Sequence, residues 1–195
     1  MPKPRKKNSK ELKPVLHIYC EGEKTEPNYI NGYLQKFHPT NRRLKVVKIE
    51  KTNKNTPVQL VELATKERKD RSTPKNDVFW VVYDREAITK YSNDLHQKAY
   101  DKASANDVQI ALSNICFELW ILLHFSDVTA CYSNCSDLLK NSPLKTKLKE
   151  IGIVNYEKAD CNLFSKISDH IDEARARADK MNNTTLNTAP NCLAK

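Results

Sequence analysis

Residues 77–84 read DVFWVVYD, an apolar run with an aspartate at each end. A run that is apolar at every position is typical of a parallel strand that is buried on both faces, because helices cover both sides of a parallel sheet. We therefore predict a strand here, at the centre of a parallel sheet.

The segments around this run alternate between strand and helix patterns. Further apolar stretches predict strands at 15–20, 44–50 and 108–112. Helices are predicted at 57–70, at 93–105 and after a cap at Thr25, where the inward face of the helix carries Ile30, Tyr33, Leu34 and Phe37. The βαβαβαβ order favours an α/β fold with a mainly parallel, four-stranded sheet flanked by helices.

The rest of the chain is interpreted as an extension and two tails. The α/β domain is predicted to span 14–126, after a basic flexible tail at 1–13. A helical extension follows at 127–181, with helices at 134–141, 143–151 and 162–181, and residues 182–195 are expected to form a loose tail.

Acidic residues stand directly after two of the predicted strands. Glu21 follows the first strand beside Gly22, Asp84 ends the central strand, and Glu86 lies on the same side as Asp84 if the strand continues. Ligands of parallel sheets bind beyond the carboxyl ends of the strands, so these carboxylates are expected to share one rim. Mutual repulsion raises the pKa values of crowded carboxylates unless a cation lies between them, and Mg2+ (or Mn2+) prefers carboxylate and phosphate oxygens.

Two neighbouring acids are interpreted differently. Glu23 and Glu26 lie near the start of the first helix, where the helix dipole favours negative charge. We expect both side chains to be solvated and to lie outside the site.

The segment SNICFELWILLHF, residues 113–125, is too rich in large apolar side chains for a surface helix. Glu118 within it needs a partner, which is either a metal ion or a basic group such as Lys24 or Arg85. Asn114 is expected one helical turn before Glu118, and His124 is interpreted as a histidine of the core.

The composition favours a polyanionic partner. The formal net charge is +9 with a pI of about 9.2, and basic residues cluster at 3–10 and 42–48, which favours nucleic acid. No apolar segment is long enough to span a membrane and no signal peptide is recognisable, so a cytoplasmic protein without membrane contact is expected. A P-loop motif for ATP is absent from the sequence.

The six cysteines are expected to be reduced thiols, because no secretion signal is present. Cys131 and Cys135 have CxxxC spacing, but no second Cys or His pair accompanies them. A zinc site at this pair is therefore the weaker alternative.

Three segments, IYCEGEKTE (18–26), VVYDRE (81–86) and SNICFELWILLHF (113–125), together resemble the RloB family, which has a Toprim-like fold. This resemblance implies a magnesium-dependent activity on phosphodiesters, a role in bacterial defence against phage, and an ATPase partner protein. It matches Glu21 to the Toprim glutamate, and Asp84 and Glu86 to the two acids of the DxD element. Two positions depart from the pattern: Glu86 replaces an Asp, and Ile115 replaces a Pro that would preset the first turn of the following helix.

The leading hypothesis is a Mg2+-dependent, nuclease-type effector that acts on nucleic acid. Glu21, Asp84 and Glu86 would hold the metal ion, Glu118 would support them, and water would be the nucleophile. The alternative is a non-catalytic module that uses the same fold to bind nucleic acid, a nucleotide or a partner protein.

Overall fold

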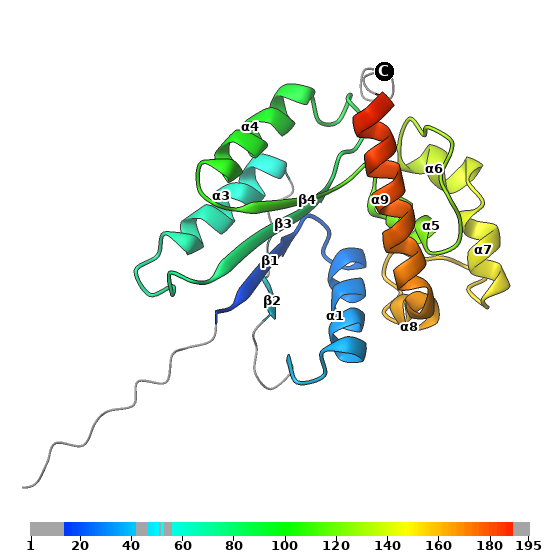
Figure 1. The fold of residues 1–195 in the computed structure, drawn as a ribbon, viewed down its shortest axis with the longest axis horizontal. Helices are drawn as coiled ribbons and strands as arrows, with labels where there is room; N and C mark the ends of the chain where they lie inside the picture. The colour runs from blue at the N-terminus through cyan, green and yellow to red at the C-terminus, as the bar shows by residue number, and fades with distance from the viewer. Residues whose placement is uncertain (1–13, 42–46, 51, 53–55, 189–195) are drawn as a thin grey trace, which may run out of the picture.

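The computed structural model describes residues 14–41, 47–50, 52 and 56–188. It contains a four-stranded, all-parallel sheet with the strand order β2-β1-β3-β4 (Figure 1). The predicted α/β fold with a parallel sheet is therefore confirmed. The strands are β1 (Leu16–Cys20), β2 (Val47–Glu50), β3 (Val78–Asp84) and β4 (Gln109–Ser113).

The crossover helices lie on two sides of this sheet. Helix α1 (Thr25–Phe37) connects β1 to β2 on one face, whereas α3 (Pro57–Arg68) and α4 (Asn93–Ser104) pack together on the other (Figure 1). The crossover from β1 runs to β2 at one edge of the sheet, whereas the crossover from β3 runs to β4 at the opposite edge. The strand order thus reverses between β1 and β3, which is where open α/β sheets bind ligands.

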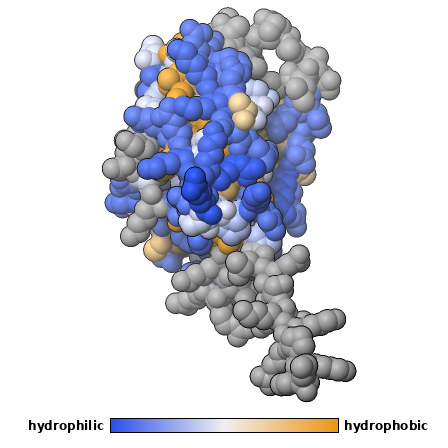
Figure 2. All heavy atoms as spheres, turned by 90° about the vertical axis from the view of Figure 1, so that its left-hand side faces the viewer, coloured by the Kyte–Doolittle hydropathy of each residue, from blue (hydrophilic) through white to orange (hydrophobic). Residues whose placement is uncertain are grey.

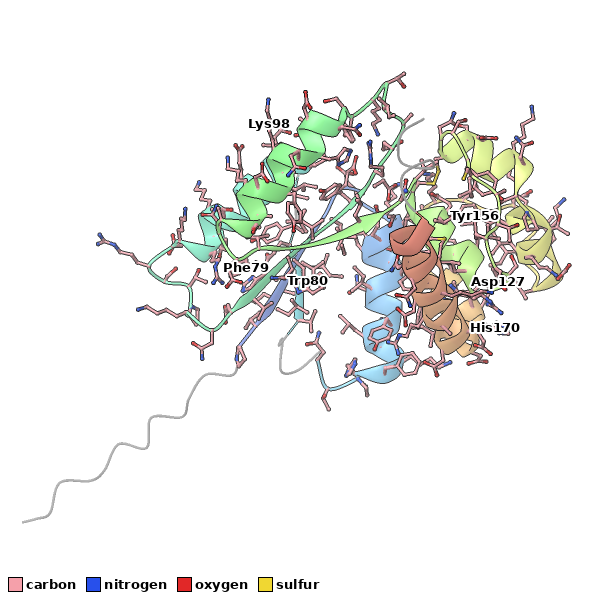
Figure 3. The ribbon with its side chains drawn as sticks, turned by 45° about the horizontal axis from the view of Figure 1, so that its top comes forward. Phe79, Trp80, Lys98, Asp127, Tyr156 and His170 are labelled. Carbon is pink, nitrogen blue, oxygen red and sulfur yellow. A yellow bond between two sulfur atoms is a disulfide. The ribbon has the colours of Figure 1, made fainter. Side chains whose placement is uncertain are left out.

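Strand β3 is buried on one face and partly open on the other. Phe79 and Val81 are fully buried against α3 and α4, but Val78 and Trp80 remain 43% and 37% exposed (Figure 3). The predicted burial on both faces is therefore wrong for the first half of this strand. Two crossover helices cover the first face, whereas one crossover helix lies on the second.

The C-terminal helices build a second core beside the sheet. Their apolar side chains surround Tyr29 of α1, and the fully buried Ile121 and Ile167 lie in the same cluster. Burial of these apolar side chains stabilises the packing of α1 against the C-terminal helices. The elements are α5 (Phe117–Leu123), α6 (Cys135–Asn141), α7 (Leu144–Glu150), α8 (Leu163–Ile167), the 3-10 turn η1 (Ser168–His170) and α9 (Ile171–Thr188).

Several helix boundaries differ from the predictions. The helix predicted at 162–181 is divided into α8, η1 and α9, and α9 continues to Thr188 into the predicted loose tail. Lys24, rather than Thr25, is the N-cap of α1 and makes no side-chain capping hydrogen bond, whereas the Thr25 hydroxyl donates to the backbone carbonyl of Lys158. Phe37 is exposed at the end of α1. The predicted tail at 1–13 lies outside the described residues.

The surface on the side of α3 and α4 is predominantly hydrophilic (Figure 2). It includes the exposed side chains of Glu62, Lys66 and Glu67 on α3. None of the helices in the described part of the chain is long and apolar enough to cross a bilayer.

Gly32 determines how closely α1 and α8 approach. A Cβ atom at Gly32 would lie 2.6 Å from the Cβ of Phe164, which is buried. We expect Gly32→Ala to lower the free energy of unfolding by about 1–3 kcal/mol through overpacking, although Ala is the better helix former. The exposed neighbour variant Asn31→Ala is the control and should be neutral or stabilising. Denaturant unfolding of both variants checks this, and a Gly32→Ala protein as stable as the wild type would contradict the packing.

Candidate functional site

Glu21 is held in place where β1 ends beside β3. Its backbone N–H donates to the Val82 carbonyl at 2.9 Å, which extends the strand pairing by one residue. Its carboxylate accepts from the backbone N–H of Asp84 at 3.0 Å and from the Tyr91 hydroxyl at 3.1 Å. Two donors on two different oxygens fix the orientation of this carboxylate.

Asp84 is the most perturbed acid of this rim. Its Oδ1 atom is buried and has no hydrogen-bond partner among the described residues. Burial, together with the negative charges of the surrounding acids, raises the pKa of Asp84 to about 8. These acids are Glu26, Glu21, Glu118 and Glu86.

Glu26 belongs to this group, contrary to the prediction of a solvated side chain. It is only 5% exposed, and burial raises its pKa, with further contributions from Glu118 and Glu21. Gly22 makes room for it, since a Cβ atom there would lie 2.2 Å from Glu26 Oε2. Helical spacing could have revealed this position, because Glu26 stands three residues before the buried Tyr29 on the inward stripe of α1. Glu23 is exposed, as expected.

Glu86 reaches the rim from a loop and not from a strand. Strand β3 ends at Asp84, so the expected alternation that would place residues 84 and 86 on one side does not apply. The φ angle of Glu86 is 57°, a left-handed conformation that is unusual outside glycine and is often found at functional sites. Its carboxylate accepts from Lys90 at 2.7 Å, and the same ammonium lies 3.9 Å from Glu21 Oε1.

Glu118 is 1% exposed and is paired, as its burial required. The partner is Lys158, whose Nζ lies 3.1 Å from Oε1, and not Lys24 or Arg85. The Tyr156 hydroxyl donates to the same oxygen at 3.3 Å. Burial alone would lower the pKa of Lys158, but Glu118 and the neighbouring acids raise it overall.

Helix α5 begins two residues later than the pattern suggested. Its N-cap is Cys116, and the Asn114–Ile115 peptide bond before it is cis. Asn114 therefore does not lie one helical turn before Glu118, and Ile115 is not in the first helical turn. His124 is a core histidine, as predicted: it is buried and accepts from the Tyr29 hydroxyl, and burial lowers its pKa to about 4.

The cysteines do not follow the prediction of reduced thiols throughout. Cys116 and Cys135 are joined by a disulfide. The sulfur of Cys135 is therefore bonded to Cys116 and, in this oxidised state, is not available as a thiolate ligand for the weaker alternative of a zinc site at Cys131 and Cys135. Sequence spacing could not show this pairing, because the two cysteines are brought together by the packing of α5 against α6.

The donors at this rim fit a hard divalent cation. They are carboxylate oxygens, and one of them, Asp84 Oδ1, is buried without a partner. Lys90 and Lys158 neutralise only the two flanks, at Glu86 and Glu118. Within the part of the chain that is described, Glu21, Asp84 and Glu86 do not form a group whose carboxylate oxygens all lie within 4.8 Å of one another. This spacing suits an ion held by one or two carboxylates together with water and substrate phosphate.

A cavity of about 290 Å3 lies next to this rim, between β4, α5 and α9. Val82, Asn114 and Trp120 contribute to its wall, and none of the five carboxylates does. The carboxylate cluster is therefore a site of its own beside a mainly apolar hollow.

A family model described as RloB-like protein matches residues 16–194, which is nearly the whole chain. Neither a curated protein nor a solved structure matches significantly.

The raised pKa of Asp84 makes stability depend on pH. The pKa of this carboxyl group is near 3.9 in the unfolded chain and about 8 in the folded protein. The protonated group therefore favours folding, and this contribution to stability is lost as the pH rises from about 4 to about 8. In the presence of a chelator, Asp84→Asn should therefore be more stable than the wild type at pH 8, by about 2 kcal/mol or roughly 4–8 °C in Tm. Thermal melts between pH 5.5 and 8.5 test this, with the exposed Glu23→Gln as control. Parallel curves for wild type and Asp84→Asn would contradict the burial of an unpaired carboxylate.

Proposed function

The chain belongs to the RloB-like family, and we propose that it is a metal-dependent enzyme that cleaves phosphodiester bonds of nucleic acid in bacterial antiviral defence. The observation that carries the chemistry is the convergence of four carboxylates on Asp84, whose Oδ1 atom is buried without a partner among the described residues, at the reversal of strand order between β1 and β3. The defence role and an ATPase partner protein rest on the family resemblance, and a cytoplasmic location rests on the sequence.

The residues of the cluster have distinct tasks in this proposal. Asp84 and Glu21 hold the cation, with Glu26 and Glu86 beside them, and the fixed orientation of Glu21 means that little reorganisation is needed when the ion enters. Mg2+ or Mn2+ held by these residues would neutralise charge on the phosphate and would lower the pKa of a water molecule, the proposed nucleophile.

Basic groups on the flanks suit a phosphate backbone. Lys90 and Lys158 are half-exposed, and each lies next to a carboxylate of the cluster. A phosphate could exchange for these carboxylates as the partner of either ammonium. Glu118 is then a positioning residue, because it touches Lys158 rather than the reacting atoms.

Variants of three cluster carboxylates and of one exposed control residue test the enzymatic function. We expect Glu21→Gln, Glu26→Gln and Asp84→Asn each to lower divalent-dependent cleavage of DNA or RNA at least 100-fold, because each removes a charge from the cluster. Glu23→Gln should retain activity, since Glu23 is exposed in the same segment. The assay follows loss of intact DNA and RNA with Mg2+ or Mn2+ and with a chelator.

The same assay distinguishes the proposed enzyme from the non-catalytic binding module. If the protein binds nucleic acid but does not cleave it with any of the metal ions, it is the non-catalytic module that uses the same fold, and not an enzyme. Cleavage that persists in Asp84→Asn would show that the carboxylate cluster is not the active site.

Binding to nucleic acid should be mainly electrostatic, because the formal net charge is +9. Each phosphate that the protein neutralises contributes a slope of about −0.7 to −0.9 to log K against log salt concentration. We expect an observed slope of about −3 or steeper when binding is measured by fluorescence anisotropy in calcium or chelator. Affinity that stays constant between low and high salt would contradict this.

A further inference from the structure

Three ligand atoms of a second kind lie beside the carboxylate cluster. The sulfur atoms of Cys116 and Cys135 and a carboxylate oxygen of Glu118 all lie within 4.8 Å of one another. Cys116 and Glu118 come from the start of α5, and Cys135 is the first residue of α6. No other group of three such residues meets this distance in the described ranges.

The contact between Cys135 and Glu118 suits a different chemical state from the disulfide. Cys135 Sγ lies 3.1 Å from Glu118 Oε2, which is hydrogen-bond distance for a thiol. A disulfide sulfur carries no proton, so in the oxidised protein the sulfur and Glu118 Oε2 face each other as two electron-rich atoms with no proton between them, although the Lys158 ammonium lies 3.7 Å from the sulfur. A proton on the thiol or a metal ion between the two atoms would remove this repulsion.

We propose that Cys116, Cys135 and Glu118 form a zinc site when the disulfide is reduced. A dithiol reductant transfers two electrons and two protons to the disulfide and is itself oxidised to a disulfide, which leaves two thiols. Zinc then binds the two thiolates, both thiol protons are released, and Glu118 Oε2 is the third ligand. Tetrahedral zinc–thiolate bonds of about 2.3 Å place the sulfurs about 3.8 Å apart, so the disulfide and the zinc site exclude each other.

The Glu118 oxygen that would not bind zinc, Oε1, is already oriented by other side chains. Oε1 is held by Lys158 at 3.1 Å and by the Tyr156 hydroxyl at 3.3 Å, while Oε2 faces the sulfur (Tyr156 is labelled in Figure 3). Metal-binding carboxylates commonly have their non-ligating oxygen oriented by such hydrogen bonds. Two soft thiolates with one carboxylate favour zinc over magnesium, in contrast to the oxygen-only cluster around Asp84.

The geometry also provides access. Cys116 is fully buried, but Cys135 is half-buried and Lys158 beside it is 58% exposed, so an ion can enter from the side of Lys158. Three protein ligands leave the fourth position of tetrahedral zinc to water. The inference does not depend on cleavage of phosphodiesters, because Asp84, Glu21 and Glu26 take no part in it.

Cobalt is the probe, because thiolate-bound Co2+ absorbs through sulfur-to-metal charge transfer and carboxylate-bound Co2+ does not. Full-length protein is reduced with a phosphine, freed of reductant without air, and titrated with Co2+ and then with Zn2+. We expect one thiolate-bound Co2+ per chain, displaced by one Zn2+, and no such band in the unreduced protein. Failure of the reduced protein to show this band overturns the proposal, whether or not nuclease activity is found.

Matched variants locate the site. Cys135→Ala and Glu118→Gln should weaken zinc binding at least 10-fold, and Tyr156→Phe by about 10-fold through the lost orientation of Oε1. Cys131→Ser, four residues before Cys135, should bind as the wild type does. A charge-transfer band that survives Cys135→Ala overturns the assignment.

Circular dichroism tests the proposal if reduction of the disulfide partly unfolds the protein. In that case zinc should restore the helical signal of the wild type but not of Cys135→Ala. Equal behaviour of the two proteins contradicts the proposal.

Discussion

The parallel pairing of β1 with β3 is the constraint on which the candidate site depends. The two strands are neighbours in the sheet, but their connections leave in opposite directions, so no crossover helix closes the edge between them. The hydrogen bond from the Glu21 N–H to Val82 continues the pairing beyond β1, which brings the Glu21 carboxylate to the backbone N–H of Asp84. The position of the first two acids is thus a consequence of strand register.

The remaining acids add a cost that the protein alone does not offset. At an effective dielectric constant of about 20, two like charges 4 Å apart repel by about 4 kcal/mol. Lys90 and Lys158 compensate Glu86 and Glu118 at the flanks, but Asp84 and Glu26 in the middle have no cationic partner within ion-pair distance among the described residues. The protein therefore keeps its most costly charges where a divalent cation would be most strongly attracted, which is typical of a functional site.

The sequence predicts features set by local pattern better than features set by tertiary packing. The βαβ order and the positions of Glu21 and Asp84 follow from periodicity and from the rule that ligands bind at strand ends, and the structure places both residues at the same rim. Glu26 was assigned to solvent because the helix dipole explains an acid near a helix start, yet its burial depends on Gly22 and on the packing of α1. Lys158 lies in a loop more than 130 residues after Thr25, and its backbone carbonyl accepts a hydrogen bond from the Thr25 hydroxyl. No local sequence pattern indicates such a contact. The disulfide likewise depends on the approach of α5 to α6.

Glu118 connects the two sites by having two oxygens with different partners. Oε1 holds Lys158, whose ammonium also responds to the charges of Asp84 and Glu26, whereas Oε2 faces Cys135. A positive ion between Oε2 and the sulfurs would draw negative charge from Oε1 and weaken its hold on Lys158. The released ammonium would then be available to Asp84 and Glu26 or to a phosphate bound beside them. In this proposal the state of the sulfur pair would be linked to the charge balance at the carboxylate cluster through Glu118 and through Lys158, whose ammonium also lies 3.7 Å from Cys135 Sγ, and the linkage would require no movement of the sheet.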